Sequence, residues 1–437
     1  MLKYNEMKKN ILIIGSGARE HALGWKLNQS NQIKQIFFCP GNGGTVRNVN
    51  IPYTDTDKLI GFAKESECDT IVGPENPLAE GVVDAFLNEG LRIFGPKKAA
   101  ARLESSKEFS KNFMKKYGIP TAHFYTFSSY DDAKDYIRSQ SGKLVVKADG
   151  LASGKGVFVC RDRKEAFEAI DVLMLQRKFG DAGNKVVIEK CLTGEEVSYI
   201  GICDGERLIP LATSKDHKRA LNNDKGPNTG GMGCYSPSIA IDEDMDRKIM
   251  KDIMERTVSG MKNEGIPFKG FLYAGIMIDK DKRSPNVLEF NARMGDPECQ
   301  TLMVRMKSDL YEYIEAAMEG KLHTKPFLTW KKEFSVCVVM AAKGYPGKYR
   351  TEDIIHGLNT DYSNNVVVFH AGTKKNSKNR LVTAGGRVLC VTSTGQNLAE
   401  ARNRAYSAVR HIHWGQEGEY YRTDIGNVNV NGREILF

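Results

Sequence analysis

Short apolar runs alternate with amphipathic segments from residue 11 to residue 96. The apolar runs are "ILIIG", "IKQIFFC", "TIVGP" and "LRIFGP", and helical patterns such as "LAEGVVDAFLNEG" separate them. Strands that alternate with helices predict a parallel, doubly wound α/β sheet. We therefore expect a first domain over residues 8–106.

A helix with its own start and stop signals follows this pattern. Ser105 to Glu108 form an S-x-x-E capping box, and Gly118 and Pro120 supply terminators. Lys107 is expected in the first turn of this helix. From about residue 121 to 194 the pattern changes to short strands around helices, including "LVVKADG", "KGVFVC" and "KVVIEKCL".

The remaining chain divides at a break in the pattern near "LHTKPFLTWKK". Residues 195–325 mix strands with a long glycine-rich loop and a helix from about Asp242 to Glu264, and residues 334–437 are mainly β with one helix. We expect a central domain over 107–325, with a small flap subdomain at about 121–194, and a C-terminal, mainly β domain over 333–437.

The composition indicates a globular protein with several cores. A chain of 437 residues is too long for one ordinary core, and 41% hydrophobic with 27% charged residues is typical of folded domains. The net charge of +9 is spread along the chain. Nucleic-acid-binding proteins concentrate such charge and interleave aromatic residues, so we expect no nucleic-acid partner. Anionic small substrates, or simply a basic surface, explain the charge better.

The cysteines and the N-terminus indicate a reducing compartment. The nine cysteines form no C-x-x-C pair, and many lie in apolar runs such as "FSVCVVM". The first ten residues have no apolar signal-peptide core, and no run approaches the length of a membrane span. We expect buried, reduced cysteines and a cytoplasmic protein without a membrane partner. Residues 1–6 are expected to be a dispensable extension or to result from an upstream start codon.

The first glycine loop, "GSGARE", follows the first strand and opens a helix. Free amides at a helix N-terminus favour an anion. The loop resembles the dinucleotide motif, but Glu20 replaces the third glycine, and Cys39-Pro40 stand where a nicotinamide ribose needs an acidic residue. A dehydrogenase is therefore disfavoured. Phosphate binding and a glycine turn tightened for packing both remain open.

The second glycine loop, "KADGLASGKGVFV", fails as a Walker phosphate loop. Gly150 and Gly154 enclose only three residues, and Gly156 follows Lys155 where Ser or Thr is required. Apolar runs on both sides predict a strand–loop–strand hairpin with no helix behind the phosphates. Such a loop covers a triphosphate as a flexible flap, although a glycine hairpin by itself is more often only a turn.

A third stretch, "VVIEKCLTGEEVS", places a polar linker after a buried strand. Residues 189–192 can offer backbone groups to an adenine edge, and Glu195 or Glu196 can reach ribose hydroxyls. A solvated loop with ordinary charges is the alternative.

The fourth stretch, "NVLEFNARMGDPE", carries candidate metal ligands. In a strand, Glu289 and Asn291 share one face about 6 to 7 Å apart, and Leu288 and Phe290 point into a core. A carboxylate and an amide oxygen suit Mg²⁺ held between phosphates. Arg293 lies one step further and can neutralise a phosphoryl group in transfer. An edge strand that enters a turn is the alternative.

Taken in order, these three later stretches resemble the ATP-grasp fold. The wider set of motifs is similar to the phosphoribosylamine–glycine ligase family from about residue 10 to the end; it includes "IIGSGAREHAL", "PGNGGT", "IVGPENPL", "LESSKEF", "KDHKRA", "GPNTGGMGCYSP", "VVMAAKGYPG" and "GGRVLCVT". The departures are small, and none removes a charged group with an implied role. Related ATP-grasp enzymes often place a second metal carboxylate on the preceding strand, and "LYAGIMI" has none.

The resemblance implies that ATP, glycine and 5-phosphoribosylamine give glycinamide ribonucleotide, ADP and phosphate through a glycyl phosphate. It implies Lys107 and Lys147 at the ATP phosphates, with residues 150–156 closing over them. It also implies Glu196 at the ribose, Glu289 and Asn291 on Mg²⁺ or Mn²⁺, and Arg293 at the transferring phosphoryl group. The flap contacts are Gly154, Lys155 and Gly156, and those at adenine are Glu189, Lys190, Cys191 and Leu192.

The contacts to the other substrates follow from the same resemblance. Asp216 and Lys218 are implied at the acid and amine substrates, and Arg219 and Asn228 at the nucleotide. Gly17 and Arg19 are expected to meet the phosphate of phosphoribosylamine. Arg293, Lys147 and Asp216 are the expected catalytic set. A solvated basic pair is the alternative for Lys218 and Arg219.

Three other functions remain open from sequence. An ATP-grasp ligase for a different acid and amine would release ADP without glycine. A nucleotide-binding regulatory module would release no phosphate, and a dehydrogenase would bind a nicotinamide cofactor. We expect a monomer whose residues 150–156 are mobile without nucleotide.

Overall fold

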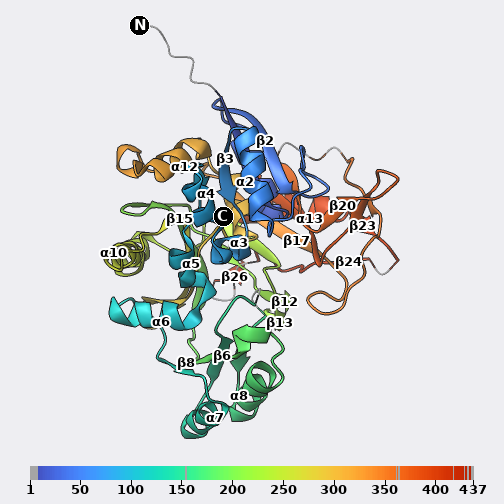
Figure 1. The fold of residues 1–437 in the computed structure, drawn as a ribbon. Coiled ribbons are helices and arrows are strands. Elements are labelled where there is room, and N and C mark those ends of the chain that lie inside the picture. Colours follow the sequence, from blue (N-terminus) through green and yellow to red (C-terminus); the bar gives the residue numbers. More distant parts are fainter. Residues whose placement is uncertain are drawn as a thin grey trace.

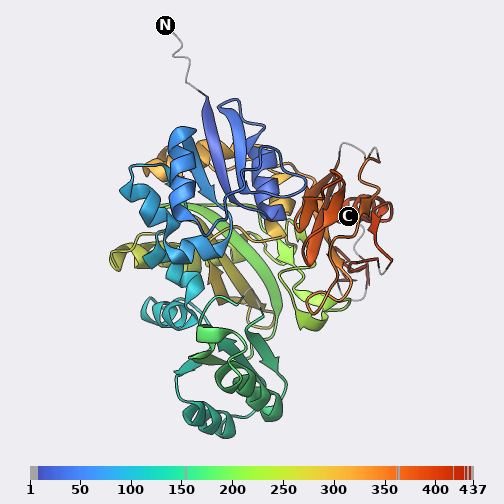
Figure 2. The same cartoon turned by 45° about the vertical axis from the view of Figure 1, so that its right-hand side comes forward.

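The computed structural model describes residues 8–152, 155–360, 362, 365–416 and 418–427, and the backbone of 429–430 and 433–434. The expected extension over residues 1–6 and the flap residue Gly154 lie outside these. The N-terminal region lies above the central region, the C-terminal region lies to one side, and the small subdomain protrudes at the far end (Figures 1 and 2).

The N-terminal region contains the expected parallel, doubly wound sheet, in the order β2-β1-β3-β4. Alternate residues of the first strand enter two different cores: Leu12 and Ile14 pack on one face, and Ile11 and Ile13 on the other. All four are fully buried, which explains the continuous apolar run in the sequence. The strands are β1 (Lys9–Gly15), β2 (Ile33–Pro40), β3 (Cys68–Val72) and β4 (Ile93–Phe94), and the helices are α1 (Ala18–Leu27), α2 (Thr56–Glu65), α3 (Glu75–Glu80), α4 (Val82–Asn88) and α5 (Lys98–Ser105).

Two local predictions in this region were wrong. The pattern "LAEGVVDAFLNEG" forms two helices because Gly81 adopts a φ of +98° between α3 and α4. The helix that carries Lys107, α6 (Lys107–Lys116), is capped by Ser106, whose hydroxyl accepts the Phe109 amide, and not by a box from Ser105. Lys107 still lies in the first turn, as predicted.

The small subdomain is a four-stranded antiparallel sheet in the order β5-β8-β6-β7, covered by helices. The predicted hairpin around the second glycine loop is confirmed, because Lys147 of β6 faces Val157 of β7 in antiparallel register. No helix therefore begins behind this loop. The elements are β5 (Phe124–Phe127), α7 (Tyr130–Ser139), β6 (Leu144–Ala148), β7 (Val157–Cys160), α8 (Arg163–Ile170), η1 (Asp171–Leu175), η2 (Gly180–Gly183) and β8 (Val186–Lys190).

The large central subdomain is built on a second antiparallel sheet, in the order β10-β9-β15-β16. Its apolar faces belong to the same two cores as the N-terminal sheet, so the two regions share a packed interior. The elements are β9 (Glu195–Asp204), β10 (Leu208–Pro210), α9 (Glu243–Ile249), η3 (Met250–Met254), α10 (Glu255–Asn263), β15 (Lys269–Asp279), β16 (Ser284–Asn291), α11 (Glu298–Met303), α12 (Leu310–Glu319) and η4 (Leu322–Thr324).

The C-terminal sheet includes strands from the middle of the chain. Its order is β11-β14-β17-β22-β19, with β24 beside β17. The motif expected as a glycine-rich loop, "GPNTGGMGCYSP", supplies β14, because Gly233 to Ser236 pair with β17 of the C-terminal region. The strands are β11 (Lys215–Asp216), β14 (Gly233–Ser236), β17 (Phe334–Ala342), β19 (Val366–His370), β22 (Arg387–Gly395) and β24 (Glu419–Tyr420), with helix α13 (Leu398–Val409) packed on them.

Short two-stranded pairs complete the C-terminal half. One of them, β12 (Arg219–Leu221) with β13 (Lys225–Asn228), projects from the segment between β11 and β14. The others are β18 (Ile355–His356) with β23 (His413–Trp414), β20 (Thr373–Lys375) with β21 (Leu381–Thr383), and β25 (Asn429–Val430) with β26 (Arg433–Glu434).

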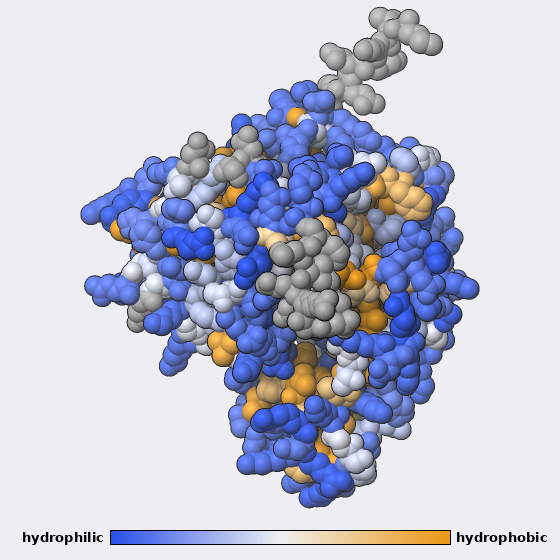
Figure 3. Space-filling model, turned by 180° about the vertical axis from the view of Figure 1, so that it is seen from behind, coloured by the Kyte–Doolittle hydropathy of each residue, from blue (hydrophilic) through white to orange (hydrophobic). Residues whose placement is uncertain are grey.

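One face of the surface is mostly polar (Figure 3), and the cysteines are free and largely buried, as the sequence predicted. Seen from behind, the surface is mostly hydrophilic, with apolar residues in small groups (Figure 3). All nine cysteines are free thiols, and only Cys191 is not fully buried. Within the described ranges, no helix combines the length and apolarity that a membrane span requires.

Candidate active site

A cavity of about 900 Å³ opens where the three regions meet. Its walls include Gly17 and Arg19 of the N-terminal region, Lys147 and Glu289 of the central region, and Arg387 of the C-terminal region. Gly154 lies outside the described residues. The sequence-predicted residues that line the cavity are Gly17, Arg19, Lys107, Lys147, Lys155, Gly156, Glu189, Lys190, Cys191, Leu192, Glu196, Asp216, Lys218, Arg219, Asn228, Glu289, Asn291 and Arg293.

Glu289 on β16 faces a group of lysines. Its carboxylate lies 3.4 Å from Lys107 Nζ and 3.8 Å from Lys218 Nζ. Burial opposes ionisation, but Lys107, Lys218 and Lys147 outweigh it and hold the pKa of the Glu289 carboxyl well below its usual range. Glu289 is therefore a permanent anion among cations, the charge pattern of a site for metal and phosphate.

Asn291, two residues further along the strand, is 8% exposed, and its Oδ1 accepts a hydrogen bond of 3.4 Å from Arg293 Nη2. A carboxylate and an amide oxygen at this spacing are hard donors that fit Mg²⁺. Among the described residues no cluster of three His, Cys, Asp or Glu side chains could hold a metal alone. A metal here would take its other ligands from phosphate oxygens and water.

A β-bulge in β16 corrects one prediction. Gly275 pairs with Glu289 and Ile276 pairs with Val287, so Leu288 has no partner in the ladder. Val287 and Phe290 are fully buried, whereas Leu288 lines the cavity instead of entering the core. The carbonyl of Leu288 is then free to accept a hydrogen bond of 3.0 Å from Lys147 Nζ.

The segment predicted to be a polar linker begins later than expected. Glu189 lies within β8, is 2% exposed, and its carboxylate is bound by Lys147 and Lys111. The amides of Lys190 and Cys191 donate to the carbonyls of His123 and Lys143. In the described part of the chain, the Leu192 amide donates no hydrogen bond, so it is available to a ligand in the cavity.

Two carboxylates, the partly buried Asp216 and the buried Glu298, line another part of the cavity. Burial, and then Glu298, raise the pKa of Asp216 well above its usual value. Glu298 accepts a hydrogen bond of 2.7 Å from Ser198, and Gly231 approaches so closely that a Cβ there would lie 2.8 Å from Asp216 Oδ1. Lys218 contacts Glu196, so it is paired and is not a solvated cation.

Arg293 is held between carboxylates of two neighbouring elements. It lies 2.8 Å from Glu104 and 3.3 Å from Glu75. Although burial favours the neutral form, these carboxylates keep the pKa of Arg293 above its usual value. The guanidinium therefore stays charged and oriented at the cavity wall.

The first glycine loop already contains a carboxylate. Glu20 folds back so that its side chain accepts the Gly17 amide at 2.5 Å and binds Arg19 Nε at 2.6 Å. Glu20 is 2% exposed. The residue that replaces the third glycine of the dinucleotide motif thus fills the space that a bound phosphate would occupy near the helix N-terminus. Glu20 in place of the third glycine was the feature of the sequence that argued against a dinucleotide site.

Sequence reasoning assigned no role to several residues of the cavity wall. Arg387 binds Asp296 at 3.1 Å and donates to the Asp296 carbonyl at 2.7 Å, so the C-terminal region takes part in the site. The motif "GGRVLCVT" was recognised without a function for its arginine. Other lining residues of this kind are Glu75, Glu104, Tyr273, Asp296, Glu298 and Tyr345.

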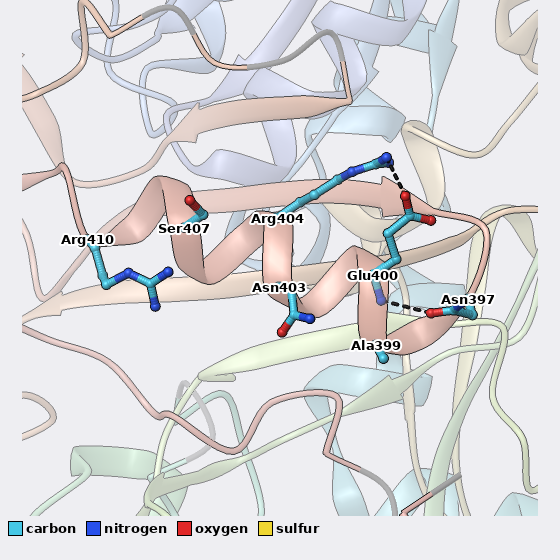
Figure 4. A pocket seen from close by; sticks show the side chains of 7 residues that line it. All are labelled: Asn397, Ala399, Glu400, Asn403, Arg404, Ser407 and Arg410. Atoms are coloured by element: carbon cyan, nitrogen blue, oxygen red, sulfur yellow. Dashed lines mark hydrogen bonds and ion pairs between the residues drawn. The ribbon is translucent and has the colours of Figure 1, made fainter. Parts of the chain in front are cut away.

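A second hollow, of about 670 Å³, lies along α13. Polar side chains, among them Asn403, Ser407 and Arg410, line it from one helix face, and Glu400 is already paired with Arg404 (Figure 4). No predicted site residue lies there, so the large cavity is the candidate active site.

Comparison with known proteins agrees with this geometry. The chain matches family models described as the phosphoribosylglycinamide synthetase N domain over residues 9–104, ATP-grasp (A) domain over 105–299 and C domain over 335–428. The phosphoribosylamine–glycine ligase of Escherichia coli (strain K12) is 50% identical over 422 residues, 95% of this chain and 97% of that protein.

Solved structures show the same relationship. The crystal structure of phosphoribosylamine–glycine ligase from Thermotoga maritima aligns with a TM-score of 0.82 and 35% identity over 95% of this chain and 99% of that one. A biotin carboxylase from Campylobacter jejuni shares the fold, with a TM-score of 0.71 and 16% identity over 95% of this chain and 94% of that one. The chain belongs to the phosphoribosylglycinamide synthetase family, ATP-dependent ATP-grasp ligases that join glycine to 5-phosphoribosylamine in purine biosynthesis.

Proposed function

We propose that the cavity is the site at which this chain forms glycinamide ribonucleotide from ATP, glycine and 5-phosphoribosylamine. The observation that carries the proposal is the position of Glu289, an ionised carboxylate that faces Lys107 and Lys218 beside the glycine hairpin. This arrangement suits a triphosphate with a divalent cation, which Mg²⁺ or Mn²⁺ would supply, because lysines neutralise phosphate oxygens and the carboxylate attracts the metal.

The nucleotide is assigned to the junction of the two central subdomains. Lys107 and Lys147 bind the phosphates, and the hairpin over 150–156 covers them. Glu196 lies beside Lys218 at the cavity wall and is assigned to the ribose. The adenine is assigned to the backbone of residues 189–192, with the Leu192 amide as donor, because the Glu189 side chain is bound by two lysines. Arg219 and Asn228, which face each other across β12 and β13, close the nucleotide side.

The chemistry divides one difficult acyl transfer into two steps. The glycine carboxylate attacks the γ-phosphorus of ATP, the bond to the ADP oxygen breaks, and a glycyl phosphate forms. The amine of phosphoribosylamine then attacks the acyl carbon and phosphate leaves. Glu289 and Asn291 would hold a metal that neutralises phosphate charge during the first step. Arg293, fixed by Glu104 and Glu75, stabilises the phosphoryl group and the acyl phosphate.

The second step requires a proton acceptor. Asp216 has a raised pKa, which makes its carboxylate a stronger base than an ordinary aspartate. We assign Asp216 as the group that accepts the proton lost by the attacking amine. Lys218, beside it, is assigned to bind the acid substrate, glycine. The phosphoribosyl phosphate is assigned to Arg19 and to the cavity wall beside Gly17, because Glu20 already accepts the Gly17 amide itself. The glycine hairpin excludes water, which would hydrolyse the glycyl phosphate.

The test is ADP release with phosphoribosylamine generated in situ. We expect ADP only when glycine and phosphoribosylamine are both present, and release without glycine would indicate a different acid substrate. Glu289→Ala should abolish ADP formation that depends on Mg²⁺ or Mn²⁺, whereas Glu243→Ala, on an exposed helix turn, should not. Full turnover in Glu289→Ala would contradict the metal assignment.

Three further properties belong to the same proposal. The chain is proposed to act as a monomer because all parts of the cavity come from one chain. A cytoplasmic location is part of the proposal, and the chain's nine free, largely buried thiols support it. No nucleic acid is proposed as a partner because the basic residues are dispersed along the sequence.

A further inference from the structure

Two buried lysines share one buried glutamate at the nucleotide end of the cavity. Lys147 of β6 binds Oε1 of Glu189, and Lys111 of α6 binds Oε2 of the same carboxylate. The Lys111 and Glu189 side chains are each 2% exposed, and that of Lys147 is 5% exposed. One buried anion thus faces two cations, and the group carries one surplus positive charge.

The two lysines differ in access to the cavity. Lys147 and Glu189 line it, whereas Lys111 is not among the described lining residues. Lys111 instead donates to Thr121 Oγ1 at 2.7 Å, and that hydroxyl donates to the Val287 carbonyl at 2.6 Å. Lys111 is therefore fixed behind the site, against the bulge of the strand that carries Glu289.

The surplus charge has a consequence for Lys147. If Lys147 moved from Glu189 to a phosphate in a site with a single counter-ion, the carboxylate would be left buried and unpaired, which is strongly unfavourable. Lys111 removes this penalty because Glu189 remains paired. We propose that Lys111 is a positioning residue: as the counter-ion that stays with Glu189, it allows Lys147 to transfer to the ATP phosphates. This inference rests on the proposed function.

The electrostatics of the group support this role. Burial first, and then Lys147, lower the pKa of Lys111 to about 8. The charged groups that face its ammonium are Glu189 from β8, Lys147 from β6 and Lys107 from its own helix, with the Phe124 ring 6.0 Å away on β5. As the pH rises through about 8, Lys111 loses its charge, and ATP should bind more weakly.

The test measures ATP binding directly, by titration of the whole chain with MgATP in the absence of glycine and phosphoribosylamine. Lys111→Met should weaken binding about tenfold or more, because Glu189 then retains Lys147. The pH-dependent weakening near 8 should disappear in this variant. Lys115→Met, exposed on the same helix, is the matched control and should bind like the unchanged chain. Because no turnover is needed, failure here is distinguishable from failure of the proposed reaction.

A second variant separates this role from a loss of packing. Lys111→Met combined with Glu189→Gln removes both charges and should return ATP binding to within about threefold of the unchanged chain. ATP binding that is unaffected in Lys111→Met, or that stays weak in the double variant, would overturn the proposal. If Lys111→Met does not fold, Lys111→Arg decides, because arginine keeps its charge across the tested pH range. It should bind ATP within about threefold of the unchanged chain and lose the weakening near pH 8, and weakening that persists would overturn the proposal.

Discussion

At the scale of single residues, Glu20 determines what the first glycine loop can do. Glycine at positions 15, 17 and 73 leaves room for its side chain: a Cβ at Gly73 would lie 2.1 Å from Glu20 Oε1, and one at Gly17 would lie 2.7 Å from Oε2. The glycines therefore serve the protein's own carboxylate. The same loop sequence with a third glycine would leave the amides for a nucleotide phosphate.

Gly73→Ala should destabilise the protein. The new methyl group displaces the Glu20 carboxylate from the Gly17 amide, and such overpacking costs about 1–3 kcal/mol. Gly61→Ala in α2 is the control, because a Cβ there meets nothing within 4 Å and alanine should stabilise the helix by roughly 0.5–1 kcal/mol. Denaturant unfolding measures both changes. Equal stability of the two variants would contradict the packing role of Gly73.

At the scale of elements, the C-terminal segment holds the β12–β13 hairpin over the cavity. Arg422, 1% exposed, donates to the Arg219 carbonyl at 3.1 Å and binds Asp224 at 2.8 Å. The next residue, Thr423, exchanges hydrogen bonds with Asn222. The hairpin that carries Arg219 and Asn228 is thus positioned by residues about two hundred positions later in the chain.

Arg422→Met should release this hairpin. Without the guanidinium, the Arg219 carbonyl loses its donor and Asp224 its partner, so the hairpin should open more often and trypsin should cleave faster at the exposed Lys225. Arg410→Met, at the exposed residue that follows the C-terminal end of α13, should leave the cleavage rate unchanged. Limited proteolysis followed by mass spectrometry measures the site and the rate. An unchanged rate in Arg422→Met would show that the hairpin is held by other contacts.

At the scale of the whole molecule, a histidine pair joins the N-terminal and C-terminal regions. His21 Nδ1 on α1 accepts the His370 amide of β19 at 3.0 Å. Burial lowers the pKa of His21 to about 3 and that of His370 to about 4. Both rings are therefore neutral in the folded protein at pH values where the unfolded chain binds protons.

The protein should lose stability in mild acid. A base whose pKa is lowered by folding contributes full stability above its unfolded pKa, about 6.5, and loses it as the pH falls toward the folded value. At about pH 5 the loss is up to about 2 kcal/mol for each histidine. Thermal unfolding between about pH 7.5 and pH 5 measures it. His21→Asn keeps an acceptor near Nδ1 but cannot titrate, so its melting temperature should fall less; an equal fall would contradict the role of His21.

The active site shows which parts the sequence could predict. The shared placement of Glu289 and Asn291 in the cavity wall was predicted because a strand places alternate residues on one face. The hairpin form of the second glycine loop was predicted because apolar runs flank its glycines. Leu288 was misplaced because a bulge depends on how a strand pairs with its neighbour. Arg387 and Lys111 carried no local signal, because a single basic residue acquires a role only from the charges that the fold brings to it.

The sequence by itself determined the alternation of strands and helices, the hairpin form of the second glycine loop and the membership of the family, because these depend on local periodicity and on motifs of fixed spacing. Only the tertiary structure decided that "GPNTGGMGCYSP" forms a strand of the C-terminal sheet, and that Glu189 is shared by two lysines. These features join residues far apart in the chain, and their energies come from pairing and burial that arise when the chain folds.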